Sequence, residues 1–403
     1  MKKPRYEKLS EKLQQQIEQD RKNSVNYGFA FDEGKMMRRD SSRDKSSVWR
    51  SAAVRDIEKI INSPFYNRYQ DKTQVFSFYK NDDISHRAIH VQLVSRIARN
   101  IGAILGLNLN LIEAIALGHD IGHTPFGHAG ERFLNEIYNE KTGRYFSHNI
   151  HSARVLDTIY PLNLSLPTLN GIISHNGEFE CKEYVPKPML SFEELDAEIE
   201  KCNMDIAYNK SLMPSTLEGC VVRVCDMIAY LGKDRQDAVR AKILPEDYDF
   251  EDTAIGRLNS EIINNLVVNI IENSYGKNYI MLDKAHYDAL VHVKKHNFDI
   301  IYKNESIEKQ YNETIKPMMF ELYNKLLSDL ENDNRSSKIF THHINRIESS
   351  YYPRKQLYME EESNQIVVDY IASMTDDYFV DLYHYLFPKS KYKIEYKGYF
   401  EKD

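Results

Sequence analysis

The sequence predicts a mostly α-helical fold, and three observations support this prediction. Glycine and proline, the residues that most often interrupt helices, number only 16 and 12 among 403 residues. Long segments carry apolar residues at intervals of three and four, which is the period of an amphipathic helix. No internal repeat, low-complexity tract or Pro/Ser/Gly-rich linker divides the chain. We therefore expect one large helical domain with peripheral elements.

Composition and charge set the broad class of the protein. Hydrophobic residues make up 42% and charged residues 28% of the chain, which is typical of a folded, soluble protein. The 53 Lys and Arg against 60 Asp and Glu give a net charge of −7, which excludes a uniformly basic nucleic-acid coat. No stretch approaches the roughly 18–20 apolar residues of a membrane span, and the first 22 residues lack the apolar segment of a secretory signal, so we expect neither feature. The four cysteines, at 181, 202, 220 and 225, form no CxxC pair, so we expect reduced thiols in a cytoplasmic protein.

Both ends of the chain are expected to lie outside the helical core. Residues 1–50 contain a polar helix over 7–20 and a segment, 35–50, with six basic and two acidic residues. We expect this segment to be a solvated, flexible arm, and contact with nucleic acid is the less favoured interpretation. The tail, 387–403, alternates Tyr and Lys and is expected to form a small β element.

The core, residues 51–386, divides into helices at recognisable signals. Apolar residues from Ile89 to Leu105 follow helical spacing, and Gly106 provides a stop. Residues 110–119 are almost wholly apolar, which predicts a buried helix. Further helical pattern covers 150–160, 214–232, 257–330, 335–350 and 363–386. Residues 176–213 show no clear period and are expected to be an irregular insertion.

The segment from His119 to Glu131 is rich in groups that carry chemistry. It reads HDIGHTPFGHAGE and follows directly on the buried helix. A buried carboxylate such as Asp120 is costly unless it is paired or bound to a metal ion. Gly118 and Gly122, on either side of His119-Asp120, allow another backbone or a ligand to approach closely.

Two other predicted helices offer further metal-type side chains. His90 lies on the apolar stripe of the 88–105 helix, and Asp226 lies on an inward-facing stripe of the 214–232 helix. Together with His119 and Asp120 they make two imidazoles and two carboxylates. This mixture suits Mn²⁺, Mg²⁺, Fe²⁺ or Co²⁺ better than a thiolate-rich structural zinc site.

Each of these residues also has a structural interpretation. A lone His90 on an apolar face is more often a satisfied core histidine than a ligand. Asp226 can bond a backbone amide or the nearby Arg223. His86 shares a helical face with His90 and competes with it as the ligand. From the residues alone, these alternatives stay open.

The glycine- and histidine-rich segment resembles a known signature. GHDIGHTPFGHAGE is very similar to the motif of the HD-domain deoxynucleoside triphosphate triphosphohydrolases, the bacterial dGTPases and their relatives. Six further blocks follow the order of that family and extend the resemblance over roughly residues 45–385: 55–76, 87–102, 146–156, 172–178, 221–238 and 366–377.

The resemblance implies a fold, a reaction and a set of residues. The fold is the helical HD domain, and the reaction is hydrolysis of a deoxynucleoside triphosphate, dGTP foremost, to deoxynucleoside and tripolyphosphate. One divalent ion (Mn²⁺, Mg²⁺, Co²⁺ or Fe²⁺) is implied, and the register, with Arg87 three residues before it, favours His90 over His86. The implied residues are His90, His119, Asp120 and Asp226 as metal ligands; His123, His128, Glu131 and His148 in catalysis; and Gln74, Arg87, Tyr230 and Asp234 on the substrate.

The chemistry of a triphosphate agrees with these roles. It carries about four negative charges, which a metal ion, Arg87 and several histidines neutralise. The leaving 5′-oxygen needs a proton, and both His128 and His148 are candidates. His128 lies three residues before Glu131, so a helix puts the two side chains on one face. We therefore expect replacement of His128 to lower kcat more than replacement of His148.

The chain also departs from the family pattern. It reads Phe65-Tyr66-Asn67-Arg68 where the family usually has Phe-Arg-Arg-Leu, and Arg87-Ala88-Ile89-His90-Val91 where it has Arg-Leu-Thr-His-Ser. These changes bear on base preference and on regulation by a second nucleotide or single-stranded DNA. Relatives assemble as tetramers or hexamers, which implies a homo-oligomer. The alternatives are another HD-type hydrolase of nucleoside monophosphates or cyclic nucleotides, and a non-enzymatic protein that binds nucleotides or single-stranded nucleic acid.

Overall fold

The computed structural model describes residues 4–176, 181–352, 354 and 356–398. Within these ranges the protein is helical, as the sequence predicts, with one two-stranded antiparallel sheet of β1 (Glu183–Tyr184) and β2 (Ile280–Met281). The α-helices are α1 (Glu11–Lys22), α2 (Ala52–Ile61), α3 (Pro64–Asn67), α4 (Arg87–Leu105), α5 (Leu109–Gly118), α6 (Gly127–Thr142), α7 (His148–Arg154), α8 (Leu166–Ile173), α9 (Phe192–Met204), α10 (Ile206–Asn209), α11 (Leu217–Arg240), α12 (Asn259–Ser274), α13 (Lys284–Asn297), α14 (Glu305–Gln310), α15 (Lys316–Glu331), α16 (Asn345–Glu348), α17 (Ser363–Ala372) and α18 (Asp376–Leu386).

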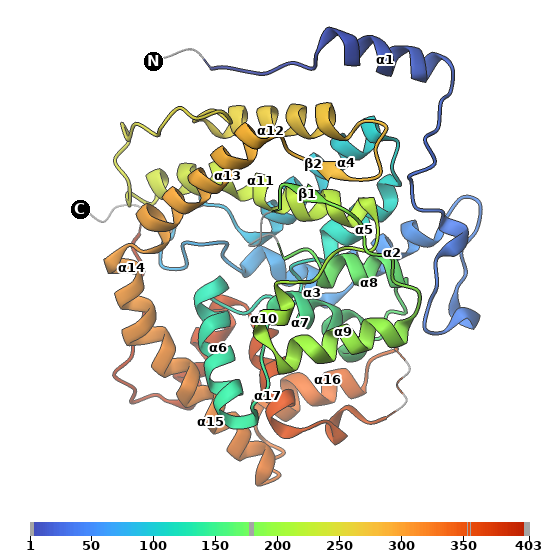
Figure 1. Cartoon of the computed structure of the whole chain (residues 1–403). Helices are drawn as coiled ribbons and strands as arrows, with labels where there is room; N and C mark the ends of the chain where they lie inside the picture. Colours follow the sequence, from blue (N-terminus) through green and yellow to red (C-terminus); the bar gives the residue numbers. More distant parts are fainter. Residues whose placement is uncertain (1–3, 177–180, 353, 355, 399–403) are drawn as a thin grey trace.

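A central bundle of α4, α5 and α11 forms one half of the molecule (Figure 1). Helices α2, α8 and α12 pack on its sides. Helix α4 buries a stripe that includes Val91, Val94 and Ala98, and it ends at Gly106, whose φ of 71° is left-handed. Asn108 is the N-cap of α5, and its side chain accepts hydrogen bonds from two backbone N–H groups of the first turn. The predicted helices over 88–105 and 110–119 are therefore confirmed.

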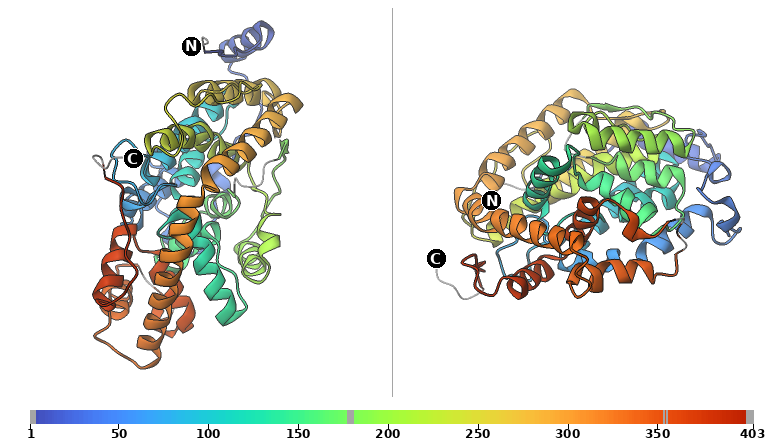
Figure 2. Two further views of the ribbon diagram at one scale, coloured as in Figure 1. Left: turned by 90° about the vertical axis from the view of Figure 1, so that its left-hand side faces the viewer. Right: turned by 90° about the horizontal axis from the view of Figure 1, so that it is seen from below.

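The C-terminal helices form the other half. Helices α15 and α17 pack against each other and against α6, with a separate cluster of buried apolar side chains. Figure 2 shows this half from two further sides, with α6 beside the orange and red helices of the C-terminal region. The 119–127 loop and α7 lie between the halves, so residues far apart in sequence meet there.

The loop that joins α5 to α6 depends on glycine for its path. A Cβ at Gly122 would lie 2.3 Å from the backbone nitrogen of Ser152 in α7, which no side chain tolerates. The loop ends at Phe126 and Gly127, both with left-handed φ values, 62° and 54°. The close approach at Gly122 presses the loop onto α7 and brings its histidines beside His148.

Two core segments differ from the sequence expectation. Residues 176–213 are not irregular throughout, because they include β1, α9 and α10. Helix α9 is capped by Ser191 and buries Phe192, Leu195 and Cys202, a narrow apolar face that its many charged residues obscure in the sequence. Residues 363–386 form two helices rather than one. The side chain of Thr375 caps α18 and so starts a new helix three residues after α17 ends.

The tail forms no strand over the described residues 388–398. Instead Lys397 makes a single parallel bridge with Tyr79. The Lys397 N–H donates to the carbonyl of Phe78 at 2.8 Å, and the Lys80 N–H donates to the carbonyl of Lys397 at 2.9 Å. One pair of bonds does not propagate a strand, and the last residues of the predicted tail lie outside the described residues.

The basic segment 35–50 is anchored rather than flexible. Arg38 is buried, and its guanidinium donates to Asp56 at 2.6 Å and to the carbonyl of Asn163 at 2.7 Å. Two further arginines pair with carboxylates of the body: Arg39 with Asp157 and Arg50 with Glu58. Half of the six positive charges are therefore neutralised within the chain, a result that the local sequence does not reveal. The polar helix expected over 7–20 is α1.

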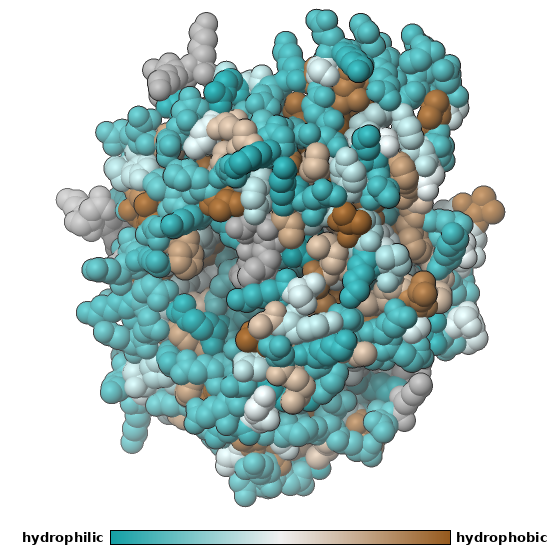
Figure 3. Space-filling model, viewed as in Figure 1, coloured by the Kyte–Doolittle hydropathy of each residue, from teal (hydrophilic) through white to brown (hydrophobic). Residues whose placement is uncertain are grey.

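The surface in Figure 3 is mostly hydrophilic, with scattered hydrophobic residues. In the part of the chain that the structure describes, no helix is both long enough and apolar enough to span a bilayer.

Candidate active site

A cavity of about 1050 Å³ lies where α4, the 119–127 loop, α6, α7, α11 and α13 meet. It gathers ten of the twelve site residues expected from the sequence: Gln74, Arg87, His90, Asp120, His123, His128, His148, Asp226, Tyr230 and Asp234. The other two, His119 and Glu131, lie directly behind this lining and contact it.

Four of these residues form a compact buried cluster. His90 comes from α4, His119 and Asp120 follow α5, and Asp226 comes from α11. The His90 Nε2 lies 2.9 Å from Asp226 Oδ1, and the His119 Nε2 lies 3.7 Å from the same oxygen. Asp120 closes the cluster, with Oδ1 3.5 Å from His119 Nε2 and Oδ2 3.9 Å from His90 Nε2. The predicted set is therefore brought together by three separate helices.

The charges of this cluster favour a positive charge between its members. The Nδ1 of His119 donates to the carbonyl of Ala116 at 2.7 Å, so its Nε2 points into the cluster without a hydrogen-bond partner. Burial opposes charge on His119, but the carboxylates of Asp120 and Asp226 outweigh it and raise the pKa of His119 to about 9. Burial likewise opposes ionisation of Asp226, and the imidazoles of His119 and His90 hold the pKa of Asp226 well below its usual range. Converging nitrogen and carboxylate donors of this kind fit a divalent metal ion.

The sequence left open that Asp226 pairs with Arg223 and that His86 takes the place of His90, and the structure shows neither arrangement. Arg223 directs its Nη1 to the backbone carbonyls of Leu212 and Ser174, while Asp226 contacts His90. His86 is the N-cap of α4, one turn before His90, and the cluster contains His90.

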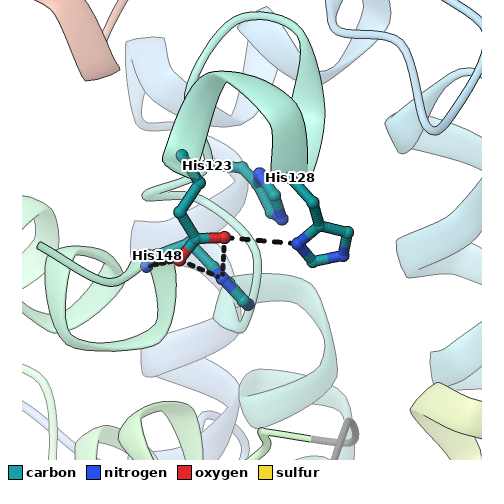
Figure 4. Close-up of side chains that lie close together, drawn as sticks. His123, His128 and His148 are labelled. Atoms are coloured by element: carbon teal, nitrogen blue, oxygen red, sulfur yellow. Dashed lines mark hydrogen bonds and ion pairs between the residues drawn. The ribbon is translucent and has the colours of Figure 1, made fainter. Parts of the chain in front are cut away.

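A second group of residues adjoins the first (Figure 4). Glu131 accepts hydrogen bonds from His128 Nδ1 at 3.2 Å and from His148 Nδ1 at 2.9 Å. The His123 ring stacks on that of His148, with ring centres 4.3 Å apart. Burial opposes charge on Glu131, but the two histidines outweigh it and hold the pKa of Glu131 well below its usual range. The predicted contact of His128 with Glu131 is found, and His148 shares the same carboxylate.

Arg87 is held against the first cluster. Its Nη1 donates to Asp120 Oδ2, and its Nη2 donates to the carbonyl of Thr73 at 3.4 Å. The side chain is 1% exposed yet lines the cavity. Arg87 therefore contacts a candidate metal ligand as well as the space available to a substrate.

Comparison with known proteins agrees with this geometry. The HD domain family matches residues 87–231, and the phosphohydrolase-associated domain matches residues 280–385. A deoxyguanosinetriphosphate triphosphohydrolase-like protein of Caldanaerobacter subterraneus is 32% identical over 342 residues, 83% of this chain and 84% of the relative. Proteins of the same description from Clostridium tetani and Rickettsia conorii are 32% and 30% identical, over 84% of this chain and 86% and 92% of theirs. The chain belongs to this triphosphohydrolase-like family.

The chain is thus an HD-domain phosphohydrolase, and residues of both matched segments line its cavity. The HD segment, 87–231, holds both clusters and supports a phosphohydrolase activity. The associated segment, 280–385, contributes Lys294, Lys295 and Lys303, and its Tyr302 hydroxyl donates to Asp234. Burial raises the pKa of Asp234 to about 7. The side-chain oxygen of Gln74, also in the lining, is buried without a hydrogen-bond partner.

Sequence reasoning missed two residues next to the clusters. His175 follows α8, and its Nε2 lies 3.2 Å from His148 Nε2 and 3.7 Å from Asp120 Oδ1. The only sequence signal is its place in the family-like block over 172–178. The buried Lys72 donates to the carbonyls of His123 and Ala372, the latter at 2.9 Å, and so ties the loop to α17. Burial lowers the pKa of Lys72 to about 7.

Proposed function

We propose that this chain is a metal-dependent deoxynucleoside triphosphate triphosphohydrolase, with dGTP as the expected substrate. One observation supports this above all: the four-residue cluster of His90, His119, Asp120 and Asp226 lies beside the His128–Glu131 pair in one large cavity. The family relationship supports the same activity, because its members are described as triphosphohydrolase-like.

In the proposed reaction, water attacks the α-phosphorus. The bond from that phosphorus to the 5′-oxygen breaks, and a proton joins the 5′-oxygen, so that deoxynucleoside and tripolyphosphate leave. A divalent ion (Mn²⁺, Mg²⁺, Co²⁺ or Fe²⁺), when bound by the four-residue cluster, neutralises phosphate charge and lowers the pKa of water.

The chain's own residues supply the remaining steps. His128 is the proposed proton donor, because its side chain is 52% exposed in the cavity and is oriented by Glu131. Arg87 and further cations in the lining suit a polyphosphate, including Arg132, Lys210, Lys294, Lys295 and Lys303. Gln74, Tyr230 and Asp234 are proposed to contact the deoxyribose.

The cationic lining favours a triphosphate over the alternative substrates. A nucleoside monophosphate or cyclic nucleotide has too few charges to need it, and the complete four-residue cluster argues against a protein without enzymatic activity. A homo-oligomer, tetramer or hexamer, and regulation by a nucleotide or single-stranded DNA are proposed on the resemblance alone. A cytoplasmic location is proposed from the four unpaired thiols.

The deciding experiment incubates the protein with each of the four dNTPs and Mn²⁺ or Mg²⁺, and resolves the products by anion-exchange chromatography. Tripolyphosphate and deoxynucleoside are expected, whereas release of phosphate or pyrophosphate would refute the proposed reaction. Asp226→Ala should lose both metal and turnover. Asp288→Ala, which removes an exposed carboxylate of α13, should keep both. Full metal retention in Asp226→Ala would make Asp226 a structural carboxylate.

A further inference from the structure

Lys72 joins the two matched segments of the chain behind the active site. It is 2% exposed, and its Nζ donates hydrogen bonds to the carbonyl of His123 in the 119–127 loop and, at 2.9 Å, to the carbonyl of Ala372 at the end of α17. We propose that Lys72 is a positioning residue for the reaction, which acts by holding His123 in place. The inference rests on the proposed function, because it takes the catalytic role of His123 from the family resemblance.

The segment around Lys72 is fixed to the start of α4. The carbonyl of Lys72 accepts from the Arg87 N–H at 3.0 Å, and the carbonyl of Thr73 accepts from the Arg87 guanidinium at 3.4 Å. Thr73 also pairs with His86 in an antiparallel bridge. The side chain of Lys72 therefore extends from a fixed point beside α4 and determines how far the 119–127 loop lies from this helix.

The imidazole of His123 has few contacts of its own that fix its position. It lines the cavity, but its Nδ1 is buried and has no hydrogen-bond partner among the described residues. Its ring stacks on that of His148, with centres 4.3 Å apart, and meets the ring of His128 edge-on at 4.9 Å. Ring contacts tolerate a range of separations that a hydrogen bond does not. The ring therefore follows its own backbone, and Lys72 holds the carbonyl of that same residue.

The position of Lys72 indicates a hydrogen-bonding role rather than contact with the substrate. Lys72 is not among the described residues that line the cavity. Its partners are two carbonyls, and a neutral amine has two N–H groups, so both bonds persist without a positive charge. Burial, with Arg68 and Arg87 nearby, lowers the pKa of Lys72 to about 7. Burying an amine costs free energy that an apolar side chain avoids, so we expect its loss to affect turnover more than stability.

Lys72→Met tests this role in the full-length protein at saturating Mn²⁺, with the dNTP that is hydrolysed fastest. Methionine keeps most of the length of lysine but donates no hydrogen bond. The kcat for tripolyphosphate release should fall about ten- to hundred-fold, because a displacement of about 1 Å at a catalytic group costs this much. KM should change less than about threefold, since the cations that line the cavity remain.

Lys59→Met is the matched control. Lys59 lies on α2 and also donates to a backbone carbonyl, that of Asn163 at 2.8 Å. It is not among the described residues that line the cavity, so its replacement should leave kcat unchanged.

A second measurement follows His123 itself. NMR spectra of ¹³C-labelled histidine rings, recorded with diamagnetic Mg²⁺ and assigned with His123→Ala, should show the His123 signal displaced in Lys72→Met but not in Lys59→Met. The His148 ring lies close enough for its ring current to change this signal when His123 moves. A structural role alone would lower the midpoint of urea denaturation and leave the signal in place. If Lys72→Met does not fold, Lys72→Gln replaces it, because its amide nitrogen lies one bond nearer the backbone and cannot reach both carbonyls.

Three results would overturn the inference: unchanged kcat in a folded Lys72 variant, an unmoved His123 signal in that variant, or an equal fall of kcat in Lys59→Met. Unchanged kcat together with tripolyphosphate release by the unaltered protein rejects the role of Lys72 and leaves the proposed function. A displaced signal in a protein that releases no tripolyphosphate keeps the hold of Lys72 on His123 and rejects the function.

Discussion

Replacing Asp376 with alanine should loosen the turn that leads into α6. Asp376 is buried at the start of α18, where Oδ1 accepts from the Phe126 N–H at 3.0 Å and Oδ2 from the Thr73 hydroxyl at 2.6 Å. Phe126 holds a left-handed backbone that a non-glycine residue rarely adopts. The carboxylate therefore fastens a strained turn one residue before the helix that carries His128 and Glu131.

The size of the effect follows from these contacts. A buried N–H left without a partner costs about 1–3 kcal/mol, and this applies to Phe126. The Thr73 hydroxyl keeps Ser77 as a partner at 2.6 Å, so it adds little. We therefore expect Asp376→Ala to lower the free energy of unfolding by about 1–3 kcal/mol. Asp377→Ala, an exposed carboxylate in the same first turn, should lose less than about 1 kcal/mol, because only its interaction with the helix dipole is removed.

Urea denaturation of both variants, followed by kcat at saturating metal, measures this difference. Turnover should fall in Asp376→Ala alone, because a displaced α6 moves the proposed proton donor. Equal losses of stability and turnover in the two variants would refute the reasoning. The contact from Asp376 to the turn would then have no more effect than any acidic residue at the start of α18.

Three further predictions concern the cavity. Arg87→Ala should lower kcat/KM roughly ten- to hundred-fold, since a hydrogen bond to a charged group is worth about 1.5–3 kcal/mol. Arg87→Lys should restore little of the lost kcat/KM. Unchanged kinetics in Arg87→Ala would place Arg87 outside the substrate site. His128→Ala should lower kcat by about 10²–10⁴-fold with metal content unchanged, and full turnover would assign proton transfer elsewhere. Because burial raises the pKa of Asp234 from 3.8 to about 7, the folded state binds this proton more tightly, and stability should fall as pH rises through that interval. Asp234→Asn should remove that slope in urea titrations at several pH values, and an unchanged slope would contradict the assignment.

Local pattern in the sequence was sufficient for the helical class and for much of the first cluster. Helical periodicity is a property of neighbouring residues, so α4, α5 and α11 could be predicted without any tertiary contact. The same holds for the His128–Glu131 pair, because its members share one helix. His90 and Asp226 could not be assigned from local pattern alone. Their apolar surroundings made them candidate metal ligands, and the family resemblance favoured His90 over His86.

Only the tertiary structure decided which distant groups meet. His175 lies 55 residues beyond Asp120 in the chain, and its position next to it follows from the packing of α8 against α5 and α7. The division of 363–386 into two helices accompanies contacts of Asp376 with residues 250 and 303 positions earlier. The anchoring of Arg38 likewise depends on Asp56 and on the carbonyl of Asn163. The energy of a buried charge or hydrogen bond depends on partners that only the folded chain brings near, so it cannot be predicted from local periodicity.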